Sequence, residues 1–315
     1  MDTYRAVFAL DSPCLTPWRA DTLFGHLCWA LARLRGDDAL AALLEQCEAG
    51  DPPLLISDGM PHGLLPRPLV PQAQSAASTV AERIAGLRAA KEARARRWLR
   101  PDEFRRVIEA SPEPVAGAEA EDTPFYTLHN QIHRGTGATT GNEDDETGRL
   151  FAVSGVWLDA VDVYVRVRPD ADLPWVAMIE HVAQSGYGKR RSSGYGSVRS
   201  VTIEPFDGFA PPEGADGFVT LSACVPAADD PTRGFWMADV KHGRLGEERA
   251  ASSRPFKRPV VRLLAGSAFR TGSAPRLWYG RMVPGVSPAF PDVVDYGLAF
   301  AVALRWPDGA EEGDD

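Results

Sequence analysis

The spacing of apolar residues near the start of the chain changes from the period of a strand to that of a helix. Residues 4–10 are rich in aromatic and β-branched types and predict a first strand. The next segment places apolar residues at helical spacing: Leu23, Phe24, Leu27, Ala30, Leu31 and Leu34. Asp21 is a candidate N-cap and Gly36 a stop signal, so the pattern predicts a long helix between them.

The middle of the chain carries a different pattern. Residues 51–75 are rich in proline and predict strands and turns. Residues 79–110 return to a helical period, with arginines dense on one side. Residues 112–123 form an acidic linker rich in proline and alanine. Residues 125–153 then predict a strand, a long loop and a returning strand.

Three further segments complete a known order of elements. Residues 153–167 predict strands, residues 173–184 a helix, and residues 198–206 another strand. The predicted order is β-α-insertion-β-β-α-β. This is the order of the ferredoxin-like unit, in which two helices cover one face of a four-stranded antiparallel sheet.

The last third predicts a second block. Apolar stretches at 218–225 and 296–306 predict strands, with basic loops between them. We therefore expect an α+β fold of two ferredoxin-like (RRM-like) β-α-β-β-α-β domains. The N-terminal domain covers residues 1–207, with an insertion at about 51–125. The C-terminal domain, residues 208–315, is a degenerate copy with an acidic tail.

Composition limits the function classes. The 315 residues are 44% hydrophobic, which supports a sizeable core, and the net charge of −9 argues against a nonspecific coat on DNA. No apolar run approaches the roughly 20 residues that a membrane span needs. The four cysteines lack CxxC spacing, which predicts reduced thiols in a cytoplasmic protein. The six histidines are scattered, so we expect no metal and no cofactor.

The segment 185–198, SGYGKRRSSGYGSV, is the strongest candidate for chemistry. A Walker A loop requires Ser or Thr where Arg190 stands, and the dinucleotide fingerprint requires a preceding strand and a following helix. Nucleic acid fits better, because glycines admit phosphates to the backbone while cations, hydroxyls and tyrosines bind phosphates and bases. The candidate RNA-binding residues are Gly186, Gly188, Lys189, Arg190, Arg191, Ser192, Ser193, Gly194 and Tyr195. An ordinary turn with solvated charges is the alternative.

Basic residues elsewhere add weaker candidates. The second block contributes Lys241, Arg254, Lys257 and Arg258. The last two follow Phe256, an interleaving of aromatic and basic types that suits single-stranded nucleic acid, although a solvated face is the alternative. Trp18 and Arg19 precede the first helix and could contact RNA or a subunit, or Trp18 could belong to the core.

His26 is the one candidate for catalysis. A histidine can act as acid and base in metal-independent RNA cleavage, but it needs a positioned partner. His26 stands in the first helix among apolar neighbours, which is the usual context of a packed core histidine. No Lys or Tyr lies near it in sequence. We expect no enzymatic activity.

Five segments together resemble the RAMP superfamily. They occur at residues 20–31, 64–71, 129–139, 185–198 and 252–269. Among RAMP proteins they are most similar to the Csm-series subunit that caps the 5′ handle of CRISPR RNA in type III-A effector complexes. The resemblance covers almost the whole chain, in order. It assigns no role to the helical segment 79–110 or to the acidic loop 143–146.

The resemblance implies two ferredoxin-like folds and a noncatalytic role in antiviral defence. Such a subunit holds the repeat-derived 5′ handle and contacts the large palm-domain subunit and a backbone RAMP subunit. The HNxIxR segment adds His129, Asn130 and Arg134 as RNA-binding candidates, with Asn130 either reading a base edge or pinning its own loop. The alternatives are a metal-independent endoribonuclease that processes CRISPR RNA, and a pure assembly subunit.

Overall fold

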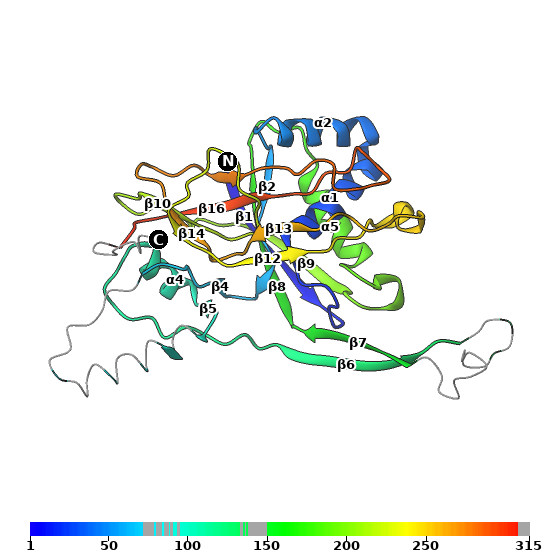
Figure 1. Cartoon of the computed structure of the whole chain (residues 1–315), viewed down its shortest axis with the longest axis horizontal. Helices are drawn as coiled ribbons and strands as arrows, with labels where there is room; N and C mark the ends of the chain where they lie inside the picture. Colours follow the sequence, from blue (N-terminus) through cyan, green and yellow to red (C-terminus); the bar gives the residue numbers. More distant parts are fainter. Residues whose placement is uncertain are drawn as a thin grey trace.

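Two antiparallel sheets form the body of the protein, and helices pack against the first of them (Figure 1). The computed structural model describes residues 1–71, 95–132 and 150–307, together with the single positions 79, 84, 88, 91, 92, 135 and 137. The predicted mixture of helices and antiparallel strands is confirmed.

The first sheet has the strand order β2-β8-β1-β9, with β3 also paired to β8. Its strands are β1 (Asp2–Leu10), β2 (Leu54–Ile56), β3 (Met60–Pro61), β8 (Ala160–Val167) and β9 (Val198–Pro205). Every pairing in it is antiparallel. The inner strand β1 buries Ala6, Phe8 and Leu10 at alternate positions, as strand geometry requires.

The chain passes through this layer in the order β1-α1-β2-β8-α5-β9. Helices α1 (Ala20–Arg35) and α5 (Trp175–Ser185) pack on each other, and α5 contacts β9. A further helix, α2 (Asp37–Glu48), follows α1 directly and was missed by the sequence analysis. Gly36 separates the two helices with φ +88°, so the stop signal at this glycine is confirmed.

The prediction of Asp21 as the N-cap of the first helix is wrong. Asp21 lies inside α1 and is buried. The cap comes from a distant loop: Asp58 Oδ1 accepts the backbone N–H of Ala20 at 2.8 Å and that of Ala223 at 3.2 Å. A carboxylate at this end satisfies a free helix donor and complements the helix dipole. Asp58 thereby joins α1 to the second half of the chain.

The predicted insertion at 51–125 includes part of the first sheet, because β2 and β3 lie within it. It also holds a small ribbon of β4 (Leu65–Pro66) and β5 (Trp98–Leu99) and the helix α4 (Pro101–Ile108). The prediction of one helical segment over 79–110 is therefore wrong at residues 98–99, which form β5. The residue before a proline disfavours the helical conformation, and Pro101 is well suited to start a helix, so α4 begins there.

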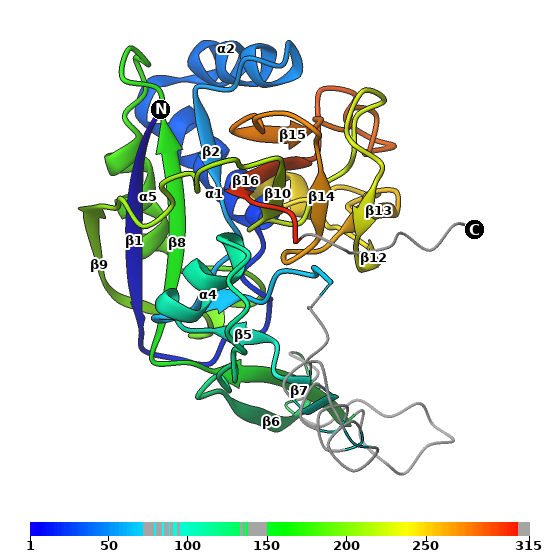
Figure 2. The same ribbon diagram turned by 90° about the vertical axis from the view of Figure 1, so that its left-hand side faces the viewer.

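Strands β6 (Thr123–Asn130) and β7 (Leu150–Trp157) form a long hairpin and pair with no other strand among the described residues (Figure 2). Figure 1 shows this hairpin along the lower side of the molecule, outside both sheets. Its base is tied to the body where Cys14 pairs with Val156. The two predicted strands are confirmed, whereas the acidic segment 143–146 lies outside the described residues.

The second sheet has the order β11-β14-β10-β16-β15. Its strands are β10 (Gly217–Thr220), β11 (Gly234–Phe235), β14 (Ala268–Arg270), β15 (Trp278–Gly280) and β16 (Leu298–Leu304). A separate ribbon pairs β12 (Ala238–Lys241) with β13 (Val260–Leu263). The described residues from 208 to 307 contain no α-helix, so the order β-α-β-β-α-β does not recur there. The predicted boundary at residue 207 lies between β9 and β10.

One hydrophobic core connects the two sheets. It includes Phe8 from β1, Phe24 from α1 and Phe300 from β16. The ring of Tyr296 stacks on Phe24 at 4.6 Å, across the two halves of the chain. All four cysteines are free thiols. None of the helices in the described ranges has the length and apolar character that a bilayer crossing requires.

Candidate nucleic-acid interface

The segment 185–198 forms a loop between α5 and β9, and one of its tyrosines anchors it in the core. Tyr187 is 1% exposed, and its ring stacks on Trp18 at 4.0 Å. The Tyr187 hydroxyl accepts the N–H of Arg19 at 3.0 Å and donates to the carbonyl of Pro17 at 2.9 Å. Tyr187 therefore holds the Gly-rich loop against the segment that leads into α1.

The glycines of this loop are required by its backbone. Gly188 and Gly196 have φ +80° and +63°, in the left-handed region that favours glycine. A Cβ on Gly196 would lie 2.0 Å from the carbonyl oxygen of Tyr187, and one on Gly188 would lie 2.7 Å from Thr16 Cβ. These close approaches let the loop fold tightly over the body and turn its central residues outward.

Some polar residues at the tip of the loop are exposed, and others contact neighbouring side chains. Lys189, Ser192 and Ser193 are exposed. Arg190 has a left-handed φ of +59°, and its guanidinium lies 5.0 Å from the ring centre of Phe151 on β7. Arg191 forms an ion pair with Glu247. The exposed cation and hydroxyls suit phosphate contacts, whereas the two arginines are held by neighbours.

The hairpin and the Gly-rich loop meet at an aromatic junction. His129 Nε2 and the Tyr195 hydroxyl are hydrogen-bonded at 3.2 Å. The His129 ring stacks on Phe151, its cross-strand partner, at 5.5 Å, and Phe125 contacts Tyr195 edge-on at 5.9 Å. The structure thus brings together two segments that the sequence analysis had selected separately.

The HNxIxR segment contains two other candidates, Asn130 and Arg134. Asn130 is exposed at the end of β6, where it pairs with Leu150. Arg134 lies outside the described residues. Asn130 therefore has an amide available at the outer end of the aromatic junction.

His26 supports the loop from beneath. Its Nε2 accepts the backbone N–H of Gly188 at 3.2 Å, and its ring lies 5.3 Å from that of Tyr187. Burial, followed by the positive charge of Arg191, lowers the pKa of His26 to about 4. The histidine is therefore neutral at physiological pH, and the nitrogen that could act as a base is occupied by the loop backbone.

Two candidates that precede α1 are committed to the body of the protein. Trp18 is 5% exposed, its ring lies against Tyr187, and its indole N–H donates to Cys14 Sγ at 3.3 Å. The assignment of Trp18 to RNA contact is corrected to a core residue, because the stacking face is covered. Arg19 forms ion pairs with Asp58 at 3.2 Å and with Asp239 at 3.5 Å. Its guanidinium therefore connects the N-terminal and C-terminal halves of the chain.

Two of the predicted basic residues in the second half belong to a buried ion network. Lys241 Nζ pairs with Asp21 and bonds Thr22 Oγ1 at 2.7 Å. Lys257 Nζ pairs with Asp295 at 2.8 Å and is 17% exposed. Burial opposes the charged form of Asp21, but Lys241 and Arg262 outweigh it and hold its pKa below the usual value. Phosphate binding does not fit Lys241 or Lys257, because each is already paired with a buried carboxylate.

The remaining candidates in this half stay available. Arg254 and Arg258 are exposed, and Phe256 between them is 65% exposed. The guanidinium of Arg244 lies 5.6 Å from the centre of the Phe256 ring. An exposed aromatic ring with cations on both sides retains the character of a platform for single-stranded nucleic acid.

Three residues of the site were missed by the sequence analysis: Phe125, Phe151 and Glu247. Phe125 and His129 occupy the same face of β6, a period-2 signal that the sequence contains. Phe151 becomes visible only once the hairpin register is known. Glu247 is distant in sequence from its partners Arg33 and Arg191, so no local pattern marks it.

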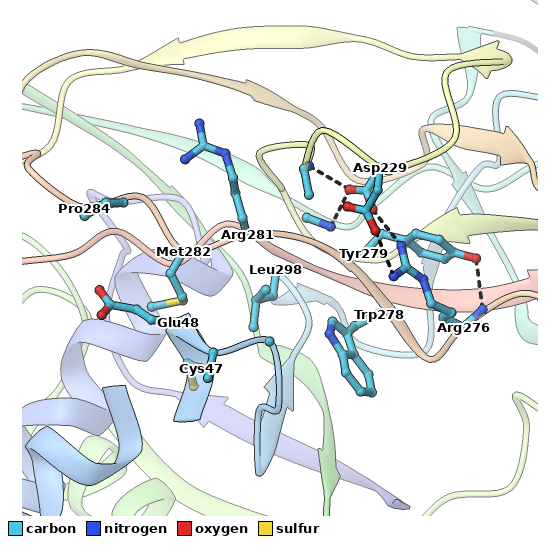
Figure 3. A pocket seen from close by; sticks show the side chains of 15 residues that line it. Cys47, Glu48, Asp229, Arg276, Trp278, Tyr279, Arg281, Met282, Pro284 and Leu298 are labelled. Carbon is cyan, nitrogen blue, oxygen red and sulfur yellow. Dashed lines mark hydrogen bonds and ion pairs between the residues drawn. The ribbon is translucent and has the colours of Figure 1, made fainter. Parts of the chain in front are cut away.

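A cavity of about 540 Å³ lies elsewhere, between the end of α2 and strand β15 (Figure 3). Figure 3 shows Trp278, Met282 and Glu48 among the residues that line it. Arg276, which also lines the cavity, pairs with Asp230 at 2.9 Å. The cavity shares no lining residue with the Gly-rich loop or the hairpin, so it is not part of the junction.

Several solved structures that resemble this fold come from type III-A CRISPR complexes. No family model and no curated protein matches the sequence. Chains solved as the Csm1–Csm4 cassette, in complex with pppApA or with cA4, show 16% and 18% identity with TM-scores of 0.60. Each match covers 98% of this chain and 100% of the other.

A third match joins these to a second assembly. A chain of the Csm3–Csm4 subcomplex of the type III-A CRISPR-Cas interference complex matches with 12% identity and a TM-score of 0.57, covering 97% of this chain and 100% of that one. Csm4 is the component that the cassette and the subcomplex share. The chain therefore has the Csm4-type fold, as its resemblance to the RAMP superfamily predicted.

Proposed function

We propose that the chain is a noncatalytic RNA-binding subunit of a type III CRISPR-Cas effector complex, and that it holds the 5′ repeat-derived handle of the CRISPR RNA. The observation that carries this proposal is the junction of the Gly-rich loop with the hairpin. There His129 and Tyr195 are hydrogen-bonded at 3.2 Å beside an exposed lysine and two exposed serines. Aromatic rings next to cations and hydroxyls match what single-stranded RNA requires.

In this proposal the residues divide into two roles. Lys189, Arg254 and Arg258 are exposed cations that neutralise phosphates, aided by Ser192 and Ser193. The aromatic junction supplies stacking surfaces for bases, and the exposed amide of Asn130 supplies hydrogen bonds to a base edge. Phosphate contacts hold the strand in place, while contacts to bases distinguish the handle from other RNA.

The fold supports the architecture expected of such a subunit. We assign the first sheet with α1 and α5 to a ferredoxin-like domain, because its elements follow the order β-α-β-β-α-β. We assign the second sheet to a degenerate copy that has lost its helices. The shared core and the contacts of Asp58 and Arg19 would hold the two as one platform.

The proposed partners follow from the fold neighbours. Those chains were solved with Csm1 and with Csm3. We propose that this chain bridges a large palm-domain subunit and a backbone RAMP subunit in the same way, in a complex of the cytoplasm. Exposed apolar residues on the ribbon β12–β13, Val240 and Val261 among them, are available for such contacts.

The noncatalytic part of the proposal rests on His26. A general base needs a free lone pair within reach of the proton that it removes. The Nε2 lone pair of His26 accepts the Gly188 N–H, and its pKa of about 4 leaves the ring a weak base. We therefore assign His26 the role of holding the loop.

A binding and cleavage experiment tests the proposal. The full chain, alone or with a large-subunit partner, is mixed with labelled handle RNA in a metal-free buffer. We expect salt-sensitive binding without cleavage, and a loss of about tenfold or more when Lys189, Ser192 and Ser193 are all changed to Ala. Binding that is equal for the variant would contradict the assignment of the loop. Specific cleavage that disappears in His26→Ala would instead identify an endoribonuclease.

A further inference from the structure

Glu247 occupies an unusual place beneath the Gly-rich loop. It begins a short 3₁₀ turn, Glu247–Ala251, in the second half of the chain, and its backbone has a left-handed φ of +51°. Its carboxylate accepts hydrogen bonds from Arg33 on α1, at 2.6 Å, and from Arg191 in the loop. Glu247 therefore ties three separate parts of the chain together.

The backbone and the charges both indicate a specifically built contact. A left-handed backbone costs free energy for a residue with a Cβ, and it persists where the surrounding contacts enforce it. The Glu247 side chain is 13% exposed. Burial favours its neutral form, but the hydrogen bond from Arg33 and the charge of Arg191 outweigh this and lower its pKa. The carboxylate is thus charged and shared between two guanidinium groups.

The contact with Glu247 limits how Arg191 can bind an RNA phosphate. Its guanidinium pairs with Glu247, and 23% of the Arg191 side chain is exposed. Lys189, two positions earlier, is exposed. A phosphate that takes the place of Glu247 beside Arg191 would leave a poorly solvated carboxylate without one of its partners, which disfavours that exchange.

We infer that Glu247 is a positioning residue that withholds Arg191 from the RNA and leaves Lys189 as the cation of the loop that meets phosphate. The inference rests on the proposed function. Because Glu247 pairs with Arg191, fewer cations of the loop are free to bind phosphates. This pairing lowers the part of the RNA affinity that does not depend on RNA sequence. Base stacking and base contacts at the aromatic junction then contribute a larger fraction of the free energy of RNA binding.

The test counts phosphate contacts from the salt dependence of RNA binding. For single-stranded RNA each contact adds roughly 0.7 to the slope of log K against log salt concentration. In Glu247→Gln the side chain keeps its shape and loses its charge, so Arg191 is released and the slope steepens by about 0.7. The matched control is Glu248→Gln, which makes the same charge change at an exposed neighbour and keeps the wild-type slope.

Two further variants, Arg191→Ala and Lys189→Ala, test the inference even if Glu247→Gln does not fold. Arg191→Ala alone leaves the slope and the handle affinity within twofold of wild type, whereas Lys189→Ala flattens the slope by about 0.7. The double variant Glu247→Gln/Arg191→Ala returns to the wild-type slope. Unfolding midpoints of all variants confirm that each is folded.

Two results would overturn the inference. One is a flatter slope for Arg191→Ala, which would mean that this arginine already contacts phosphate. The other is identical behaviour of Glu247→Gln and Glu248→Gln. Failure of the proposed function looks different, because the wild-type chain itself would then show no salt-dependent binding to the handle, and the inference would fall with it.

Discussion

Asp21 on α1 and Arg262 on β13 form a buried ion pair at 2.7 Å, with 2% and 1% of their side chains exposed. Arg262 also pairs with Asp295, which in turn binds Lys257. Lys241 completes the network from the other end, through Asp21. Two carboxylates therefore alternate with three cations across the junction between the first helix and the second half of the chain.

Removing the central cation should destabilise the whole protein. In Arg262→Leu, Asp21 and Asp295 stay buried with one lysine each, and breaking a buried pair typically costs about 3–5 kcal/mol. We expect a loss of about 3 kcal/mol, because the lysines compensate in part. Urea unfolding measures it as a lower midpoint with an unchanged m-value.

A surface ion pair provides the comparison. Arg270 lies 3.4 Å from Asp216 with 45% of its side chain exposed. Arg270→Leu should cost less than about 1 kcal/mol, as exposed pairs usually do. Equal losses for Arg262→Leu and Arg270→Leu would show that the buried network contributes no more than a surface contact.

The protonation of His26 should make the fold sensitive to mild acid. Its pKa falls from 6.5 to about 4 in the folded protein, so the unfolded chain binds this proton more readily. The stability that neutral His26 contributes is complete above pH 6.5. It is lost as the pH falls from 6.5 towards 4, by at most about 3 kcal/mol.

Comparison of variants isolates this effect from the titration of carboxylates. Glutamine can still accept the Gly188 N–H but does not titrate, so His26→Gln should lose less stability than wild type between pH 6.5 and 4. Substitution of the exposed His242 by Gln should leave the wild-type profile unchanged. Parallel profiles for wild type and His26→Gln would contradict the assigned role.

Local patterns predicted many of the helices and strands but not the contacts between them. The apolar spacing of β1, α1 and the hairpin strands was sufficient, because each element buries a regular face. The cap of α1 was mistaken, since Asp21 is adjacent in sequence whereas the true partner, Asp58, reaches Ala20 from a later loop. Helix α2 was missed, although Asp37 at its start is a favourable first-turn residue.

In the candidate site too, the sequence indicated the segments, whereas only the tertiary structure showed their contacts. The Gly-rich loop was found from its composition and the HNxIxR segment from the resemblance to RAMP proteins. Their meeting at Tyr195 and His129 followed only from the fold. Lys241 and Lys257 looked like free basic residues because their acidic partners are remote in sequence. Charge counts therefore indicated a polyanion site, while tertiary structure decided which cations are available to it.

The aromatic junction should contribute directly to RNA affinity. Base stacking on an aromatic residue is worth about 1–3 kcal/mol, so Tyr195→Ala should weaken handle binding about tenfold. Tyr195→Phe keeps the ring and loses only the bond to His129, so a loss of about threefold or less is expected. Fluorescence anisotropy with labelled handle RNA measures both.

The opposite face of the hairpin supplies a control for this prediction. Tyr126 is the neighbour of Phe125 on β6, points away from the junction, and is 75% exposed. Tyr126→Ala should keep handle affinity within twofold of wild type. If Tyr126→Ala and Tyr195→Ala weaken binding equally, the RNA does not distinguish the two faces, and the junction loses its special role.

Gly196 should tolerate no side chain, whereas Gly194 should tolerate one at moderate cost. Both have positive φ, so alanine strains the backbone at either position by about 1–3 kcal/mol. At Gly194 no atom lies within 4 Å of the added Cβ, while at Gly196 the carbonyl oxygen of Tyr187 lies at 2.0 Å. Gly196→Ala must therefore displace the backbone of Tyr187, the residue that anchors the loop on Trp18.

The two glycine variants separate backbone strain from loop position. We expect Gly194→Ala to lower the unfolding midpoint modestly and to keep handle affinity within about threefold. Gly196→Ala should lower both, with a loss in affinity of about tenfold or more, because Lys189 and Tyr195 move with the backbone. Urea unfolding and RNA titration of both variants give the comparison. If both glycines behave alike, strain alone explains the effect and the close approach to Tyr187 has no part in binding RNA.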